Sequence, residues 1–203
     1  MTFALPAVAG LLLIQAVAGT ETTVGTVKRV RPQVDASRAS EVLALAAAAV
    51  LHQNDVLRSG KKARLEAEFL DGTSLMLGEN AELKLDTYVY DPTNALRNRL
   101  MATIRGAFLF IGGKTKNTAI KVTIAAPDAV VEGQGTTVWA GPIDDAYGVL
   151  AVAGMVSVTT KGGSATLSAG EGTTITSAED PPSKPKVWPT GKRNRALTTV
   201  AFE

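Results

Sequence analysis

His52 is the only histidine in the 203-residue chain, and a carboxylate and a hydroxyl, Asp55 and Ser59, follow it closely in sequence. Histidine, carboxylate and serine are the groups of a nucleophilic hydrolase, and histidine nitrogen is a common zinc ligand. A metal centre needs several such ligands, however, and the chain has no cysteine to supply them. We therefore interpret His52 as a surface or turn residue rather than a catalytic or metal-binding one.

Paired carboxylates are the second feature with catalytic potential. Glu66 and Glu68 stand two residues apart, which on a strand is about 7 Å and is compatible with glycoside hydrolysis. The solvated face of an ordinary strand has the same spacing, and we favour that interpretation. Asp71-Gly72 and Asp144-Asp145 lack the alternating oxygen ligands of a calcium loop, so turn and loop roles are expected for them.

Glycine and aromatic residues could also build a ligand site. Gly133 and Gly135 lack the third glycine and the following helix of a dinucleotide fingerprint, so a bend or bulge is expected and no cofactor is predicted. Aromatic side chains could line a sugar- or peptide-binding surface, although core packing is favoured for Trp139. These aromatic residues are Tyr88, Tyr90, Trp139, Tyr147 and Trp188. We assign no catalytic, cofactor-binding or metal-binding residue and predict that the chain is not an enzyme.

The bulk composition limits the classes of partner. The chain has 21 basic and 19 acidic residues, a net charge of +2, with 20% charged and 45% hydrophobic residues. This balance is typical of a folded globular chain. The net charge is too small for the broad positive field that binds a phosphate backbone, so nucleic acid is not expected as a partner.

The first 18 residues carry no charge and end in Ala16-Val17-Ala18, a small-x-small pattern that a signal peptidase accepts before Gly19. We predict a signal peptide over residues 1–18, with an uncleaved anchor as the alternative. The apolar run is shorter than the roughly 20 residues of a membrane-spanning helix, so no membrane span is expected in the mature chain. The predicted location is the periplasm or the medium.

Short β-strands dominate the rest of the chain. Between Ala63 and Tyr88, apolar residues alternate with charged ones at a period of two, which is typical of half-buried strands. We expect a two-residue type I′ hairpin at Asp71-Gly72 and three antiparallel strands in a meander. Similar short runs, separated by glycine, continue to Thr176. The predicted fold is all-β, with antiparallel strands and hairpins in a sandwich-like or short solenoid arrangement and little helix.

Three segments do not follow this pattern. The alanine-rich residues Glu41 to Leu51 favour a helix by propensity, although a strand entering a turn is equally compatible. Asn94 to Met101 is expected to be one helical turn or a loop. From residue 178 onward, prolines and basic residues predict an extended, loosely held tail. The expected organisation is therefore a signal peptide over 1–18, a β domain over 24–177 and a tail over 178–203.

Six ordered motifs resemble those of the FecR domain family, and together they span residues 25 to 177. They are Gln53 to Gly60, Phe69 to Leu75, Ile104 to Phe108, Ala126 to Thr136, Val152 to Val156 and Leu167 to Gly170. Two positions depart from the family pattern: Gln134 replaces the usual arginine before Gly-Thr, and Asn54 replaces a glycine.

The resemblance implies a non-catalytic envelope domain. Regulators of this family combine a cytoplasmic anti-sigma segment, one membrane helix and a periplasmic FecR domain. Here the predicted export segment comes first, so we expect a stand-alone domain that binds a protein or an envelope polymer, in a role that includes signalling. The alternatives are a self-associating structural protein and a glycan-processing hydrolase. Strand addition at an exposed sheet edge is the simplest binding mode for such a fold.

Overall fold

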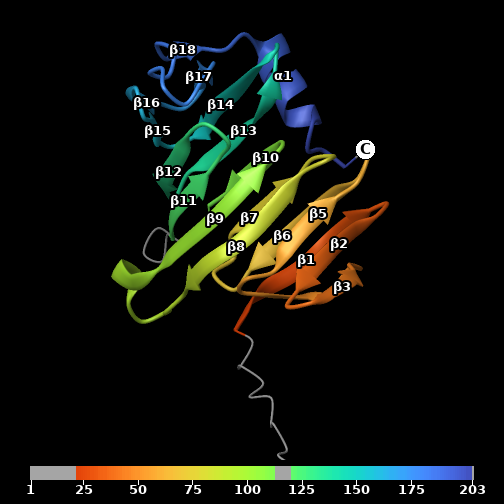
Figure 1. Ribbon diagram of the computed structural model, residues 1–203. Coiled ribbons are helices and arrows are strands. Elements are labelled where there is room, and N and C mark those ends of the chain that lie inside the picture. The colour runs from red at the N-terminus through yellow and green to blue at the C-terminus, as the bar shows by residue number, and fades with distance from the viewer. Residues whose placement is uncertain (1–21, 113–119, 203) are drawn as a thin grey trace, which may run out of the picture.

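The computed structural model describes residues 22–112 and 120–202, and within them the chain forms a sandwich of two nine-stranded sheets (Figure 1). The first sheet, in spatial order, contains β18 (Lys186–Val187), β17 (Glu171–Ile175), β14 (Ala146–Ala153), β13 (Thr137–Ile143), β10 (Phe108–Ile111), β7 (Ser74–Leu77), β6 (Arg64–Phe69), β1 (Thr23–Arg31) and β4 (Val50–His52). The second contains β16 (Gly163–Leu167), β15 (Val156–Thr160), β12 (Val130–Gln134), β11 (Lys121–Ala125), β9 (Arg99–Arg105), β8 (Glu82–Val89), β5 (Val56–Ser59), β2 (Val34–Arg38) and β3 (Glu41–Ala44). The predicted all-β, sandwich-like fold with little helix is confirmed.

Side chains that alternate along the strands build the core between the two sheets. In β6 and β9 every second residue is buried, as the period-two pattern predicts. Leu65 and Ala67 of the first sheet and Leu83 and Leu85 of the second belong to one continuous apolar cluster.

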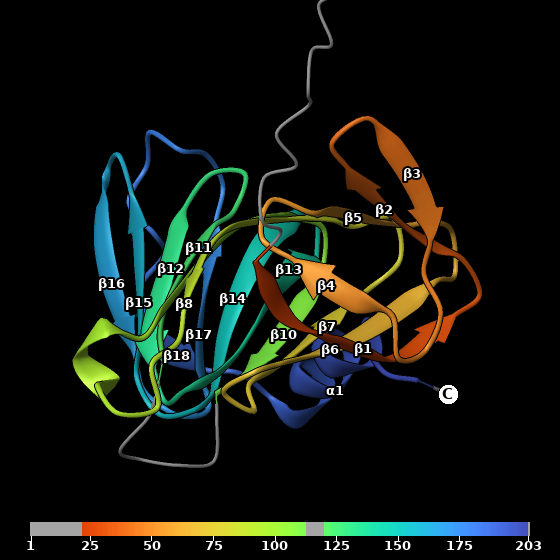
Figure 2. The same cartoon turned by 90° about the horizontal axis from the view of Figure 1, so that it is seen from below.

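The predicted three-stranded meander is wrong. β6 and β7 pair antiparallel in the first sheet, but β8 crosses to the second sheet, where it pairs with β5 and β9. Later segments alternate between sheets in the same way, so that successive hairpins lie on opposite sides of the core (Figure 2). This arrangement buries the apolar face of each hairpin against its neighbours in the chain, which a single meander sheet would leave exposed to water.

The hairpin between β6 and β7 also differs from the prediction. Glu68 pairs with Ser74, and the Phe69 amide donates to the Thr73 carbonyl, so the loop has three residues, Leu70 to Gly72, rather than two. Of the three, only Gly72 has a positive φ, 79°. This is a type I turn closed by a bulge at glycine, because Asp71 keeps a negative φ.

The C-terminal segment is folded, so the expected loosely held tail is wrong for residues 186–200. Helix α1 (Thr190–Thr198) packs outside the first sheet and contacts β13. Trp188, Ala196 and Val200 are buried in a second apolar cluster with Trp139 and Leu150. Burying so large an aromatic surface outweighs the preference of a proline- and lysine-rich segment for extended solvated chain.

The two ambiguous segments are resolved as follows. Residues 41–51 contain no helix: β3 and β4 flank a turn. Residues 94–101 contain one 3-10 turn, η1 (Ala95–Arg97), followed directly by β9. In the part of the chain that the structure describes, no helix is both long and apolar enough to cross a membrane.

Candidate binding surface

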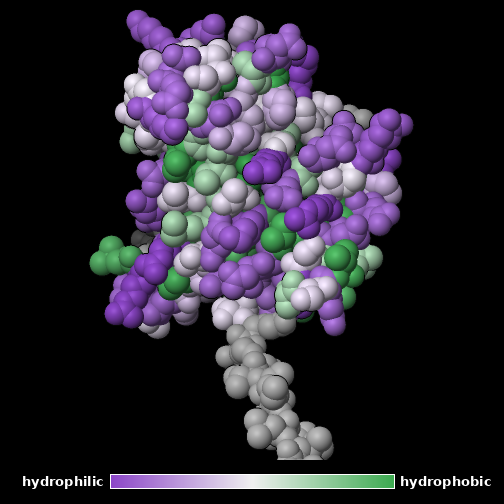
Figure 3. Space-filling model, viewed as in Figure 1, coloured by the Kyte–Doolittle hydropathy of each residue, from purple (hydrophilic) through white to green (hydrophobic). Residues whose placement is uncertain are grey.

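Strand β3 forms the outer edge of the second sheet, and all four of its side chains are exposed. Val42 is 70% exposed and Leu43 is 40% exposed. Hydrophobic atoms gather at the end of the molecule where β3 lies (Figure 3). Ten successive residues, Val42 to Leu51, carry no charge or polar side chain. We call the exposed side chains of residues 42–50, with the outer edge of β3, the edge surface.

The backbone of β3 has hydrogen-bonding groups that face solvent. β2 is its one strand partner among the described residues, in an antiparallel register that pairs Ala36 with Leu43. The Leu45 amide donates to the Val34 carbonyl at 2.8 Å. Because inward and outward groups alternate along an antiparallel ladder, the N–H and C=O groups of Val42 and Ala44 point outward. An edge of this kind is a template for an added strand.

The alanine-rich segment after β3 is fixed to the domain by backbone hydrogen bonds. The Ala48 amide donates to the Val27 carbonyl, and the Val27 amide donates to the Ala49 carbonyl, at 2.8 and 2.9 Å. Ala48 has a positive φ of 68°, which turns the chain toward β4. The edge surface is therefore preorganised, which lowers the entropy cost of binding.

A buried ion pair holds the β2–β3 hairpin in place. Asp55 is completely buried, and Arg38 Nε and Nη2 donate to its two carboxylate oxygens at 2.8 and 2.9 Å. Arg38 also donates to the Val50 carbonyl, and Asp55 accepts the His52 amide at 2.8 Å. Arg38 in β2 is thereby joined to β4 and to the turn that follows it. Two-point pairing of this kind fixes geometry as well as charge.

Asp55 and Ser59, the two residues considered together with His52 in the sequence, have structural roles. Asp55 is occupied by the Arg38 guanidinium and by the backbone of His52. The Ser59 hydroxyl donates to the Gly78 carbonyl at 2.7 Å and accepts the Ala81 amide at 2.8 Å. The hydroxyl therefore ties β5 to the segment before β8.

The carboxylate pairs are likewise engaged in ion pairs and turns. Glu66 pairs with Arg29 at 2.6 Å and Glu68 with Lys28 at 3.3 Å, so each faces its own cation on the outside of the first sheet. Asp71 accepts hydrogen bonds from the backbone and hydroxyl of Thr73.

Two tyrosines contact carboxylate or carbonyl oxygens. Tyr88 is buried against Phe69 with ring centroids 5.6 Å apart, and its hydroxyl donates to Asp71 at 3.2 Å. Burial, with the Asp71 charge, raises the pKa of Tyr88 well above its ordinary value. Burial also raises the pKa of Tyr147, whose hydroxyl donates to the Gly106 carbonyl at 3.3 Å. Both phenols therefore stay protonated near neutral pH, and neither is suited to act as a general base.

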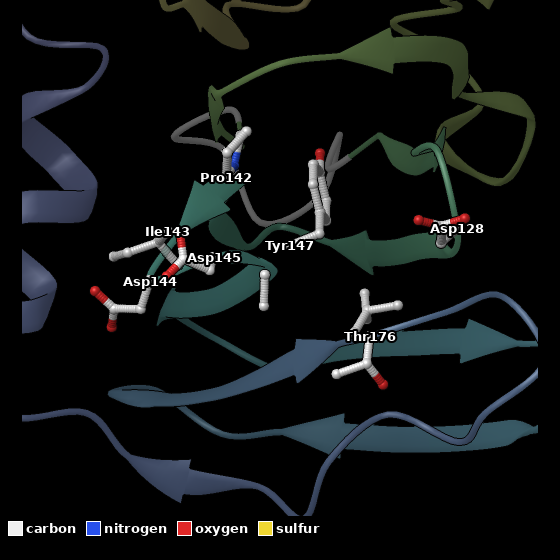
Figure 4. Close-up of a pocket in the computed structure, with 9 residues that line it drawn as sticks. Asp128, Pro142, Ile143, Asp144, Asp145, Tyr147 and Thr176 are labelled. Carbon is white, nitrogen blue, oxygen red and sulfur yellow. The ribbon is translucent and has the colours of Figure 1, made fainter.

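A hollow of about 650 Å³ lies beside the β13–β14 turn and contains three aspartates, Asp128, Asp144 and Asp145 (Figure 4). Asp128 and Asp144 lie at opposite ends of it, with Tyr147 between them. Hydrogen bonds from Lys192 and Arg195 hold the pKa of Asp144 below its usual value. Nowhere in residues 22–112 and 120–202 do histidine, aspartate and glutamate side chains form a group of three suited to a metal ion. Asp128 is thus separated from Asp144, and the Asp144 carboxylate is engaged by Lys192 and Arg195.

The remaining sequence-based candidates are structural. A side chain at Gly133 would collide with Thr136, and Gly135 has a positive φ of 60°, so the predicted bend with close approach is confirmed. Trp139 is fully buried, as expected, and its indole N–H donates to the Thr199 hydroxyl at 3.0 Å. Trp188 is buried as well and is not part of an exposed aromatic platform.

The edge surface was not singled out from the sequence. Its signal is the absence of any polar residue between Glu41 and His52. An uncharged run of that length is ordinarily read as core, and only the position of β3 at the end of the sheet exposes it.

The family model for FecR protein matches residues 55–157, which are 103 of the 203 residues. The chain belongs to the FecR family. This confirms the family indicated by the six motifs. The edge surface, residues 42–50, precedes the matched residues.

Two crystal structures of a predicted anti-sigma factor from Parabacteroides distasonis share the fold. Their TM-scores are 0.55 and 0.54, each at 14% identity over 70% of this chain. The match spans 63% and 64% of those chains, less than two thirds of their length. No curated protein matches the chain.

Proposed function

We propose that this FecR domain is a non-catalytic binding module of the cell envelope, and that its partner is a protein that adds an extended, uncharged strand to β3. The outward N–H and C=O groups of Val42 and Ala44, beside the exposed apolar side chain of Val42, are the observation that carries the proposal. The anti-sigma factor of similar fold supports a role in signalling.

The energetics fit a reversible interaction. Val42 and Ala44 present four backbone groups to a new strand, which are worth roughly 0.5–1.5 kcal/mol each once paired. Val42 and Leu43 point to opposite faces of the sheet, so the side chains of the partner on both faces would contribute specificity. The absence of charge on the edge surface selects an apolar strand, because a charged one would lose solvation without gaining a partner.

The envelope location rests on the first 18 residues, which lie outside the described residues. We propose cleavage before Gly19 and export of the mature chain. Mass spectrometry of the N-terminus after cell fractionation tests this. Gly19 in the periplasm or medium is the expected result, and an intact Met1 in the cytoplasm would overturn it.

Hydrogen exchange tests the edge surface directly. In the free protein, the Val42 and Ala44 amides should exchange quickly, while those of Leu43 and Leu45 should be protected. A photo-crosslinking residue at position 42 should then capture the partner in intact cells. The purified partner should protect the amides of residues 42 and 44.

A pair of matched variants separates strand addition from general apolar adhesion. Val42→Pro removes one outward N–H without breaking a bond to β2, and it should abolish binding. Val187→Pro is the control, since Val187 is 68% exposed on β18 at an edge of the other sheet. Binding that survives Val42→Pro would refute the proposal. If the captured partner is a second copy of the chain, the self-associating structural role would replace it.

A further inference from the structure

A groove rich in positive charge lies on the first sheet, away from the edge surface. Arg31 at the end of β1, Lys62, and Arg64 at the start of β6 line a hollow of about 430 Å³ together with Glu79. Thr198 and Ala201, at the end of the folded C-terminal segment, also line it. A second hollow of about 330 Å³ shares Arg64 and Glu79 with it. We call the two together the basic groove.

In the part of the chain that the structure describes, the cations of the basic groove lack the carboxylate partners that neighbouring cations on the same sheet have. Lys28 and Arg29, on the same sheet, each pair with a glutamate. Among the described residues, Arg31, Lys62 and Arg64 form no ion pair. The one lining carboxylate, Glu79, accepts the backbone amide of Lys62 at 2.7 Å. The described lining therefore carries three positive charges and one negative charge.

Arg64 is held at the junction of the two hollows with most of its hydrogen-bonding capacity unused. Its Nη1 donates to the Ala63 carbonyl at 2.8 Å, and its Nε is covered and has no partner among the described residues. A guanidinium has five N–H donors, and no described residue accepts a hydrogen bond from Nη2, so this group remains available to an acceptor in the hollows that Arg64 lines. Reaching Nε as well would require the residues that cover it to shift.

The lining changes character along the groove. Around Arg31 and Lys62 it is charged, whereas beyond Arg64 it includes Ala107 and Pro142 with Thr199. A ligand that fits both parts has an anionic head and a small uncharged body. Guanidinium groups favour planar or tetrahedral oxyanions, which accept two parallel hydrogen bonds.

We infer that the basic groove binds an oxyanion, a phosphate or carboxylate group, carried by a small molecule or a lipid headgroup. Arg64 contacts the anion, Arg31 and Lys62 add charge, and the apolar half of the groove receives the body of the ligand. This site is independent of strand addition at β3, because the two share no residue.

Titration calorimetry at low salt with the full mature chain tests the inference, using inorganic phosphate, phenyl phosphate, benzoate and vesicles containing phosphatidylglycerol as probes. Saturable binding of at least one probe is expected. Preference for phenyl phosphate or benzoate indicates a free small molecule, and binding of vesicles alone indicates a headgroup. Absence of saturable binding up to about 10 mM of each soluble probe, and to vesicles, would overturn the inference.

Charge variants locate the site. Arg64→Gln should weaken binding about tenfold or more, and Arg64→Lys, which keeps the charge but not the two-donor geometry, should give an intermediate affinity. Lys61→Gln is the control, because exposed Lys61 carries the same charge next to the groove without lining it. Equal effects of Lys61→Gln and Arg64→Gln would show non-specific attraction and refute the site. Unchanged unfolding midpoints of the variants would show that the fold is intact.

Discussion

Replacing Trp188 with alanine should detach the C-terminal segment from the first sheet. Trp188 is 1% exposed and packs edge-on against Trp139, with ring centroids 6.1 Å apart. The backbone of Gly172 lies so close to the Trp188 indole that no side chain fits there, and Gly148 contacts it as well. The ring is therefore enclosed on several sides, and its removal leaves a cavity that these glycines cannot fill.

The expected loss of stability follows from this packing. Truncating a buried tryptophan costs about 3–5 kcal/mol. Its indole N–H has no partner among the described residues, so removing that unsatisfied donor returns about 1–3 kcal/mol. A net loss of about 2 kcal/mol is expected from the midpoints of these ranges. Helix α1 has nine residues and no side-chain cap, so it should not persist once it is released.

Fluorescence follows the release of the C-terminal segment and the loss of stability, because Trp139 is the only tryptophan left in the Trp188→Ala variant. In the Trp188→Ala variant, its emission should shift to the red as water reaches it, and residues 186–200 should lose protection from hydrogen exchange. Urea denaturation gives the free energy of unfolding. Val187→Ala, one residue away and exposed, should change it by less than about 0.5 kcal/mol. If Trp188→Ala leaves the free energy of unfolding and the protection of residues 186–200 unchanged, Trp188 does not hold this segment on the sheet. The expectation of a loosely held tail would then stand.

Three further predictions concern other contacts. Arg38→Met should cost about 3–5 kcal/mol in urea denaturation, because it leaves the buried Asp55 carboxylate unpaired, and Arg38→Met/Asp55→Leu should recover much of that loss. In the folded state, the ion pairs of Asp144 with Lys192 and Arg195 lower its pKa below the ordinary value of 3.8. The stabilisation from these ion pairs is therefore fully present above pH 3.8 and is lost as the pH falls through the lowered pKa. Acid should therefore loosen α1, as followed by Trp139 fluorescence, and Asp144→Asn should remove that pH dependence. Gly172→Ala should destabilise the domain by about 1–3 kcal/mol, because the new methyl group overlaps Trp188, and a midpoint equal to that of the wild type would contradict this.

Local patterns were sufficient to identify strands and to exclude a site built on several histidines. The alternation from Ala63 to Phe69 predicts a strand with one solvent-facing and one buried face, and β6 has both faces. The lone His52 excluded a multi-histidine metal centre by counting alone. Neither inference depends on which strands become neighbours.

Long-range pairing was not available from the same patterns. The residues of the turn after β7 do not indicate whether β8 pairs in the same sheet as β7 or crosses to the second sheet. Both arrangements bury the side chains of Leu83 and Leu85. The hairpin at Asp71 was misjudged for a related reason. Asp-Gly suits a two-residue loop, but the hydrogen bond from the Phe69 amide to the Thr73 carbonyl leaves three residues, Leu70 to Gly72, in the loop.

By itself, the sequence determined that the chain is an all-β member of the FecR family with no multi-histidine metal centre, since periodicity, motif order and residue counts are local properties. Tertiary structure alone decided that β3 is an exposed edge strand, that Trp188 is buried, and that Arg31, Lys62 and Arg64 share a groove. Hydrophobicity records the tendency of a side chain to leave water, but whether it can do so depends on which strand comes last in the sheet and on what covers it. Those are contacts between distant parts of the chain, and the binding surfaces arise from them.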